Sequence, residues 1–300
     1  MNKELLYNNP LIFYEYLLLN PLTEIYMVRK KASIQNWEEY SNLLIDKFAI
    51  HSSSFHHLSK GIIEHRNSGE TLKMTGYDLF TVNTVFRAIM ETYATFNHIF
   101  VQPKTLEEKE FRFLLWKLDG YYQVKKYKIN VSDFEGVEKV LEDNENIITS
   151  TIQQIHNSSF IKTLKKEQII KIFNPENKSC KWRFLIRNGN IKCMQIIDLI
   201  EHTFRTRAFI NAYKHSSIHI HSNFPAIDDF KKKRGKTISK EYTDPLTRLA
   251  IYLTCLMIYD ICNINANANK VFQSYAPELK NFIEGMSTTI LQFEDEKIKR

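Results

Sequence analysis

The sequence predicts an all-α protein, a multi-helix bundle of about eight helices. Apolar residues make up 43% of the 300-residue chain, which provides ample material for a buried core. Only 8 glycines and 7 prolines are present, whereas all-β folds need many tight turns built from these residues. Apolar residues also recur at the three- and four-residue spacing of one helix face over several long segments. We therefore expect long, uninterrupted helices.

The chain is expected to form one helical domain with a short segment outside it at each end. Residues 1–32 are rich in aromatic and aliphatic side chains and are interrupted by Pro10 and Pro21, so we expect an N-terminal arm that packs against the body. Residues 33–293 form the predicted domain, and residues 294–300 form a frayed tail. The predicted helices span residues 33–66, 77–101, 106–126, 132–156, 159–173, 192–221, 246–271 and 277–293.

Local signals delimit the first four of these helices. The first is defined by apolar residues at helical spacing. The second carries apolar residues around most of its circumference and stops before Pro103, so we expect it to be largely buried. Capping-box pairs start the next two helices, Thr105 with Glu108 and Ser132 with Glu135.

The later helices are delimited mainly by proline. Asn223-Phe-Pro225 ends the long helix 192–221, Thr243-Asp-Pro245 starts the next, and Pro277 opens the last. A small hairpin is a minor alternative at the start of the long helix, because short apolar segments flank the turn sequence Arg187-Asn-Gly-Asn190.

The chain is basic, with a formal net charge of +7 and a pI of about 9.0. A basic balance favours an anionic partner such as RNA or a nucleotide, because cations release counterions from phosphates on binding. Five cations lie in one six-residue run and are the candidate nucleic-acid contacts: Lys231, Lys232, Lys233, Arg234 and Lys236. We expect this run to be a loop, and the alternative is that it is simply solvated.

The cysteine pattern argues against a structural zinc site. No C-x-x-C pair is present, although such sites need closely spaced ligands. Free, mostly buried thiols in a reducing compartment are the expected state, which predicts a cytoplasmic protein. The four cysteines are Cys180, Cys193, Cys255 and Cys262.

Two apolar stretches, residues 11–19 and 249–261, are too short to span a bilayer. Each is also interrupted by an acidic residue, Glu15 in the first and Asp260 in the second. We therefore expect no membrane association.

The first candidate site is the pair Arg87 and Glu91. On a helix these positions lie one turn apart, so the guanidinium and the carboxylate can meet. Their neighbours in the sequence are nearly all apolar, so the pair should be at least partly buried, and a buried charge needs a partner or a use. The alternative is a salt bridge that only stabilises the core.

The second candidate site is the stripe Tyr213, Ser217 and His221. These residues follow one another at four-residue spacing and so lie along one side of a helix. A hydroxyl one turn from an imidazole can orient it, and histidine is suited to act as a general acid or base. The alternative is that His221 only complements the dipole at the helix C-terminus.

A rival arrangement uses His215 and His219, also one turn apart, to clamp a metal ion. Glu91 and His98 would supply further ligands only if the two helices face each other. Two imidazoles alone make a weak site, so we expect no metal. No glycine-rich phosphate loop, G-x-S-x-G turn or HExxH helix is present, and no cofactor is expected.

Taken together, these motifs resemble a known family. R-x-x-x-E in a buried helix, an aromatic-rich helix containing Phe111-Arg112-Phe113 and Trp116, and Y-x-x-x-S-x-x-x-H closing a later helix look like a group of bacterial all-α proteins related to the HEPN-like superfamily. The resemblance covers residues 77–222. It implies a helical bundle in which five residues converge as a catalytic site: Arg87, Glu91, Tyr213, Ser217 and His221.

Many HEPN-like proteins are metal-independent ribonucleases in toxin–antitoxin and antiphage systems. The resemblance therefore implies action on RNA or a nucleotide, with His221 as acid or base and Arg87 stabilising the phosphorane. The family signature places four to six residues between an arginine and a histidine, and this chain departs from it, because seven separate Arg207 from His215. The alternative is a non-catalytic helical module that binds a partner protein, a second copy of the chain or a small ligand.

Overall fold

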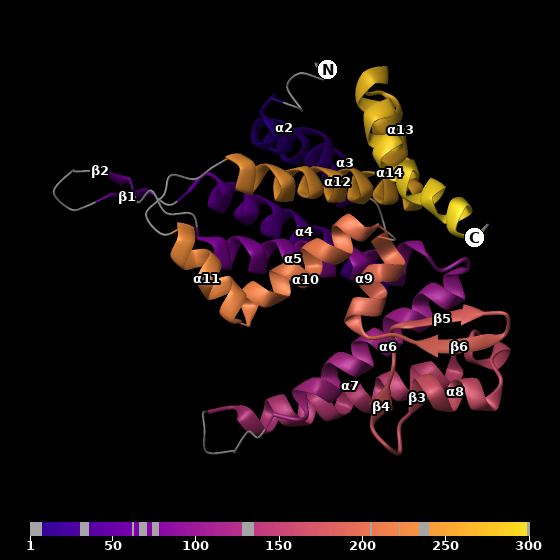
Figure 1. Ribbon diagram of the computed structural model, residues 1–300. Coiled ribbons are helices and arrows are strands. Elements are labelled where there is room, and N and C mark those ends of the chain that lie inside the picture. The colour runs from indigo at the N-terminus through magenta and orange to yellow at the C-terminus, as the bar shows by residue number, and fades with distance from the viewer. Residues whose placement is uncertain are drawn as a thin grey trace. The chain divides into compact units, whose positions relative to one another are not determined.

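The chain folds predominantly into helices, as the sequence predicts, and divides into two compact units. Unit 1 comprises residues 1–97 and 200–300, and unit 2 comprises residues 98–199. Figure 1 shows the computed structural model, in which the helices outnumber the eight that were predicted. The structure describes residues 8–30, 36–61, 63–65, 71–73, 78–127, 135–204, 206–221, 223–233 and 240–298.

Unit 1 is built from helices of both its segments. Two helical segments, η2 (Asn97–Val101) and α9 (Ile196–Phe204), cross the boundary between the units. The other elements of unit 1 are α2 (Pro10–Leu17), the π-helical turn η1 (Leu18–Leu22), α3 (Thr23–Lys30), α4 (Asn36–Ser59), the antiparallel pair β1 (Ile63–His65) and β2 (Thr71–Lys73), α5 (Leu79–Phe96), α10 (Arg207–Ile220), α11 (Phe224–Lys233), α12 (Lys240–Ile264), α13 (Ala266–Gln273) and α14 (Pro277–Ile298).

Helix α5 lies in the core of unit 1, where it packs against α4, α10 and α12. Asp78 caps its N-terminus by accepting a hydrogen bond from the Thr81 backbone N–H at 2.9 Å. Its apolar side chains are buried, as the all-round apolar pattern predicts, and those with no exposed surface include Val82, Phe86, Ile89, Met90 and Phe96.

The N-terminal arm is helical and belongs to unit 1. Helix α2 packs along α12, and the Phe13 ring meets Phe282 of α14 edge-on at 5.3 Å. Pro21 lies inside the π-helical turn η1, which joins α2 to α3 without ending the helical path. At the other end of the arm, Arg29 is buried and donates from Nε to Asn42 Oδ1 of α4 at 2.7 Å.

Helix α12 contains the one segment of the described chain that is long and apolar enough to cross a membrane, Asp244–Ile264. Of its most apolar window, 67% is buried inside the protein, which is how the core helix of a folded unit looks.

Unit 2 combines helices with two short strand pairs. Its elements are α6 (Leu106–Val124), α7 (Val137–Asn157), the 3-10 turn η3 (Ile161–Thr163), α8 (Lys166–Ile172), the antiparallel pair β3 (Phe173–Asn174) and β4 (Ser179–Cys180), and the hairpin β5 (Phe184–Arg187) and β6 (Asn190–Cys193). Helix α6 packs against α7 and against β4. The Phe111 ring lies between those of Phe160 and Phe184, at 5.2 and 6.4 Å.

The predicted helix 192–221 is wrong at its start and in its middle. Residues 190–193 form β6, and the remainder divides into α9 and α10. Hairpin β5–β6 forms because Asn188 and Gly189 both adopt positive φ, 49° and 70°, which suits the two-residue turn. Thr206 is extended, with φ −110° and ψ 141°, so α10 starts anew after it.

The segment after α10 also differs from the prediction. Pro225 does not close a helix but lies in the first turn of α11, where proline needs no backbone N–H partner. Residues 231–233 are consequently the end of a helix rather than a loop. Further along, the helix predicted over 246–271 begins earlier, at Lys240, and ends at Ile264, after which Asn265 caps α13 through the Ala268 N–H at 2.9 Å.

Candidate functional site

Contacts between α5 and α10 bring three of the five predicted site residues together. Arg87 donates from Nε to Glu91 Oε1 at 2.7 Å, one turn further along α5. Tyr213 of α10 donates its hydroxyl to the same Glu91 oxygen, also at 2.7 Å. The Arg87 guanidinium carbon lies 4.7 Å from the centre of the Tyr213 ring, a cation–π contact. We call these three residues the α5–α10 cluster.

The α5–α10 cluster is only partly shielded from solvent. The side chains of Arg87 and Glu91 are 20% and 35% exposed, and Tyr213 is 3% exposed. Burial and the hydrogen bond to Glu91 raise the pKa of Tyr213 to about 12, so the phenol keeps its proton and acts as a donor. Burial alone would lower the pKa of Arg87, but Glu91 and Tyr213 outweigh it and raise that pKa. Neither Arg87 nor Tyr213 exchanges a proton near neutral pH, so both position Glu91 rather than transfer protons.

Ser217 and His221 do not join this cluster. The Ser217 hydroxyl donates to the Tyr213 carbonyl at 2.8 Å, a bond within its own helix. His221 follows the last residue of α10, where its backbone N–H donates to the Ser217 carbonyl at 3.2 Å and its side chain is exposed. Eight residues rise about 12 Å along a helix, so His221 lies too far along α10 to share a carboxylate with Tyr213. The structure therefore brings together three of the five predicted site residues, and Ser217 and His221 lie outside that group.

A neighbouring contact was missed from the sequence. Ser216, one residue from the predicted stripe, donates its hydroxyl to Asn83 Oδ1 of α5 at 3.1 Å, and both side chains have no exposed surface. Asn83 also donates to the Leu79 carbonyl at 2.8 Å. An asparagine on the apolar face of a helix was the available signal, because a buried amide requires partners.

His215 and His219 form a pair on α10. Their Nε2 atoms lie 3.1 Å apart and their ring centres 4.6 Å apart. His215 is exposed, whereas His219 is 2% exposed and meets the Phe80 ring at 5.9 Å. Within the ranges that the structure describes, no group of three or more His, Cys, Asp or Glu side chains is arranged to hold a metal ion. Glu91, a further ligand considered above, is hydrogen-bonded to Arg87 and Tyr213 instead.

The basic run lies partly outside the described residues. Lys231 and Lys232 are exposed near the end of α11, and Lys232 Nζ forms an ion pair with Asp228 Oδ2 at 2.5 Å. Lys233 is the last residue of α11. Arg234 and Lys236 lie outside the described part of the chain.

The outer face of α11 is unusually apolar for an exposed helix. Phe224 is 81% exposed and Ile227 is 45% exposed. Lys231 follows them at the spacing that places all three on one face. Phe230 turns toward α5, where its ring lies 5.2 Å from that of Phe80. Helix α11 thus presents a phenylalanine and a lysine on one exposed face, two turns apart.

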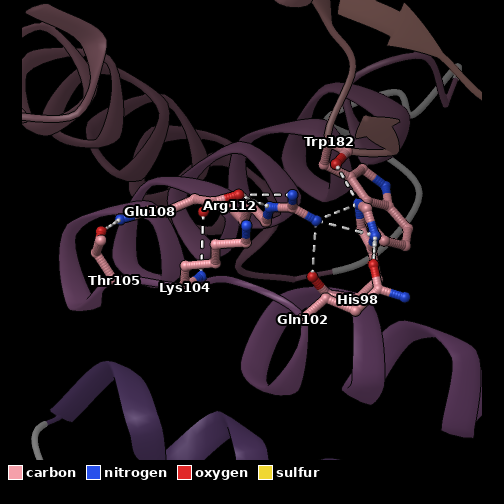
Figure 2. A network of polar contacts seen from close by, with 7 residues as sticks. All are labelled: His98, Gln102, Lys104, Thr105, Glu108, Arg112 and Trp182. Carbon is pink, nitrogen blue, oxygen red and sulfur yellow. Dashed lines mark hydrogen bonds and ion pairs between the residues drawn. The ribbon is translucent and has the colours of Figure 1, made fainter. Parts of the chain in front are cut away.

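Unit 2 contains a second polar network that sequence reasoning did not identify. Figure 2 shows Arg112 of α6 with Glu108 on one side and His98 with Trp182 on the other. Arg112 donates from Nη2 and Nε to Glu108 Oε1, at 2.7 and 3.1 Å, and is 5% exposed. Its Nη1 donates to the His98 carbonyl at 3.0 Å, and its guanidinium lies 4.9 Å from the Phe184 ring centre.

The fully buried His98 ring completes this network (Figure 2). Its Nδ1 lies 3.1 Å from Gln102 Oε1 and its Nε2 lies 3.2 Å from the Trp182 carbonyl oxygen. Burial lowers the pKa of Arg112 and the adjacent Glu108 carboxylate opposes that shift. Arg112 and His98 are buried and the Glu108 side chain is only 14% exposed, so this network holds α6 to the strand region rather than offering a reactive group. The i, i+4 spacing of Glu108 and Arg112 within an apolar helix was the signal for it.

A third polar group lies in unit 1 between α5 and α12. Tyr93 Oη and Asn97 Nδ2 both donate to Asp260 Oδ2 at 2.7 Å. Asp260 is 7% exposed, and burial raises its pKa to about 6 although both hydrogen bonds act in the opposite direction. Burial and the carboxylate also raise the pKa of Tyr93 well above its ordinary value, so the phenol remains a donor.

Comparisons of the chain with protein-family models, curated proteins and solved structures find no match. Its function is therefore inferred from its residues and their geometry. Among the groups described above, three exposed side chains on the α10–α11 segment take part in none of these contacts: the His221 imidazole, the Phe224 ring and the Lys231 ammonium.

Proposed function

We propose that the chain is an RNA-directed protein of the HEPN-like type, and that it cleaves RNA without a metal ion through His221. The observation that supports this is the α10–α11 surface, defined as the exposed residues His221, Phe224 and Lys231. An aromatic ring that faces solvent can stack on an unpaired base, and a lysine two turns further along the same face can contact the phosphate backbone. The net charge of +7 favours the same class of partner.

The roles within this proposal follow from what each side chain is free to do. His221 is exposed, so its imidazole is able to exchange protons with a bound ribose hydroxyl or leaving oxygen. Arg87 is hydrogen-bonded to Glu91 and contacts no described residue of α11, so we assign the phosphate contact to Lys231 instead. The α5–α10 cluster then has a supporting role, because it fixes α10 against α5 about two helix turns before His221.

The proposal is tested with purified protein, total RNA and EDTA. We expect cleavage by the wild type, and loss of cleavage but not of RNA binding in His221→Ala. His57→Ala is the matched control, because His57 is also exposed on a helix of unit 1 and should behave as the wild type. Cleavage that persists in His221→Ala would show that the acid or base lies elsewhere.

Binding is measured separately with a labelled single-stranded RNA over a series of salt concentrations. We expect Phe224→Ala to weaken binding, because base stacking on an aromatic ring contributes about 1–3 kcal/mol. Lys231→Ala should reduce the slope of log affinity against log salt by about one phosphate contact. A wild type that binds no RNA at any salt concentration would refute the RNA proposal as a whole.

A non-catalytic module that binds a second copy of the chain is the alternative, and a separate observation favours it. Ile12, Tyr16 and Leu19 lie at i, i+4 and i+7 on the arm and are 50%, 40% and 66% exposed. Such a stripe on a helix is typical of a helix-packing surface. Sedimentation analysis of the wild type beside Leu19→Lys tests it: a dimer that the lysine dissociates would support this reading, and a wild-type monomer would reject it.

A further inference from the structure

We propose that His215 and His219 are a chelating pair that binds one divalent transition-metal ion of the Ni²⁺ or Zn²⁺ kind. The two residues lie one turn apart on α10, and their Nε2 atoms face each other at 3.1 Å. This site is separate from the α10–α11 surface, and it does not depend on the proposed action on RNA.

The distance between the two nitrogens fits a shared ion. Imidazole nitrogens bind zinc at about 2.0–2.1 Å, so two of them at a near-tetrahedral angle lie about 3.3 Å apart. The observed separation of 3.1 Å is close to that value, so the side chains need little movement to accept a metal. In the metal-free protein the same approach is a hydrogen bond between the rings, in which one Nε2 carries the hydrogen. If the exposed His215 ring carries that hydrogen, it can transfer through solvent to Nδ1 of the same ring on metal binding, so that both Nε2 atoms can coordinate.

The surroundings hold one ligand in place and leave the other open to solvent. His219 is buried and lies against the edge of Phe80 at 5.9 Å, while Ser216 fixes this turn of α10 to Asn83 of α5. His215 is exposed on the outer side. Because one imidazole is buried and the two rings already meet at 3.1 Å, the pair is largely arranged for binding in advance, which reduces its entropic cost.

The ligand set also determines which ions fit. Imidazole suits zinc, nickel and copper, whereas calcium and magnesium require oxygen ligands. Within the described residues no third histidine, cysteine or carboxylate completes the set. We therefore expect one ion per chain, bound far more weakly than in a structural site with four protein ligands.

The test is a calorimetric titration with NiCl₂ of protein made without a polyhistidine tag. Every sample carries Cys193→Ser, because Cys193 is an exposed thiol that would compete for the metal. We expect saturable binding of one Ni²⁺ per chain in this background, and its loss in the added variant His215→Gln. His221→Gln is the matched control, because it removes an exposed imidazole near the end of the same helix and should leave Ni²⁺ binding unchanged.

A second readout guards against misfolding of the variant. Ni²⁺ should raise the thermal unfolding midpoint of the Cys193→Ser protein and of the His221→Gln control, because a ligand that binds only the folded state stabilises it. His215→Gln should still unfold cooperatively, with a metal-free midpoint lowered at most by the loss of the hydrogen bond between the rings, and should show no rise with Ni²⁺. Absence of saturable binding in the Cys193→Ser protein, or equal binding after His215→Gln, overturns the proposal. Since the RNA assay is run in EDTA, its outcome is independent of this one.

Discussion

Replacing Asp260 by asparagine should stabilise the protein at neutral pH. Tyr93 and Asn97 donate to the same carboxylate oxygen, Oδ2, so the carbonyl oxygen of an asparagine at 260 can accept both hydrogen bonds. The shape of the side chain is preserved, and only the buried negative charge is lost. This substitution therefore isolates the cost of burying that charge.

The size of the effect follows from the pKa of Asp260. Burial raises it from the ordinary value of 3.8 to about 6. Below about pH 3 the side chain is neutral in both the folded and the unfolded chain, and its contribution to stability is fully present. As the pH rises through 6 the unfolded chain has already released the proton that the folded chain holds, so stability falls. At 1.36 kcal/mol per pKa unit, the loss reaches about 3 kcal/mol above pH 6.

Urea denaturation followed by far-UV circular dichroism from pH 4 to pH 8 measures this effect. Asp260→Asn should lie within about 0.6 kcal/mol of the wild type at pH 4 and exceed it by up to about 3 kcal/mol at pH 7.5. Asp143→Asn, which removes an exposed carboxylate, should change the profile little. A loss of stability in Asp260→Asn at pH 7.5 would refute the reasoning, because the charge would then be a net stabiliser.

Three further outcomes are expected. Arg112→Met should lower the free energy of unfolding in urea by about 3 kcal/mol, because it leaves the largely buried Glu108 carboxylate without its ion-pair partner. Adding Glu108→Gln should recover part of that loss. Equal stability of Arg112→Met and the wild type would contradict this expectation. Tyr213→Phe should lower the free energy of unfolding by about 1–2 kcal/mol, because the hydrogen bond to Glu91 is lost while the ring stays over the Arg87 guanidinium. No measurable change would show that water replaces the hydroxyl. Of the 4 cysteines only Cys193 is exposed, so Ellman's reagent should titrate one thiol in the native protein and all 4 after denaturation.

The helices could be predicted from the sequence wherever their signals are local. Thr105 accepts a hydrogen bond from the Glu108 N–H at 3.2 Å, and α6 begins at the residue that this capping box predicts. The hairpin β5–β6 was only a minor alternative, because a two-residue turn competes with the helical pattern that follows it. What decides the competition is the left-handed backbone of Asn188 and Gly189, which a helix cannot accommodate.

The sites were less predictable, because they depend on packing between distant segments. The i, i+4 rule correctly brings Arg87 and Glu91 together, since that contact is internal to one helix. The same spacing rule groups Tyr213 with His221, but it takes no account of the rise along the helix axis. The buried state of Arg112 depends on Phe184, 72 residues later in unit 2 and beyond any local pattern.

The discontinuity of unit 1 has a consequence for how the chain is made. Its polar contacts join α5 to residues that follow much later, at sequence separations of 122 for Glu91 and Tyr213 and 167 for Tyr93 and Asp260. Unit 2 is one continuous segment whose corresponding contact, from His98 to Trp182, spans 84. During synthesis from the N-terminus, α4 and α5 emerge first but must wait with exposed apolar faces until α10 and α12 are made. The ribosome thus completes unit 2 before it makes the second segment of unit 1, residues 200–300. A pause in translation after residue 199 would therefore give unit 2 time to fold before unit 1.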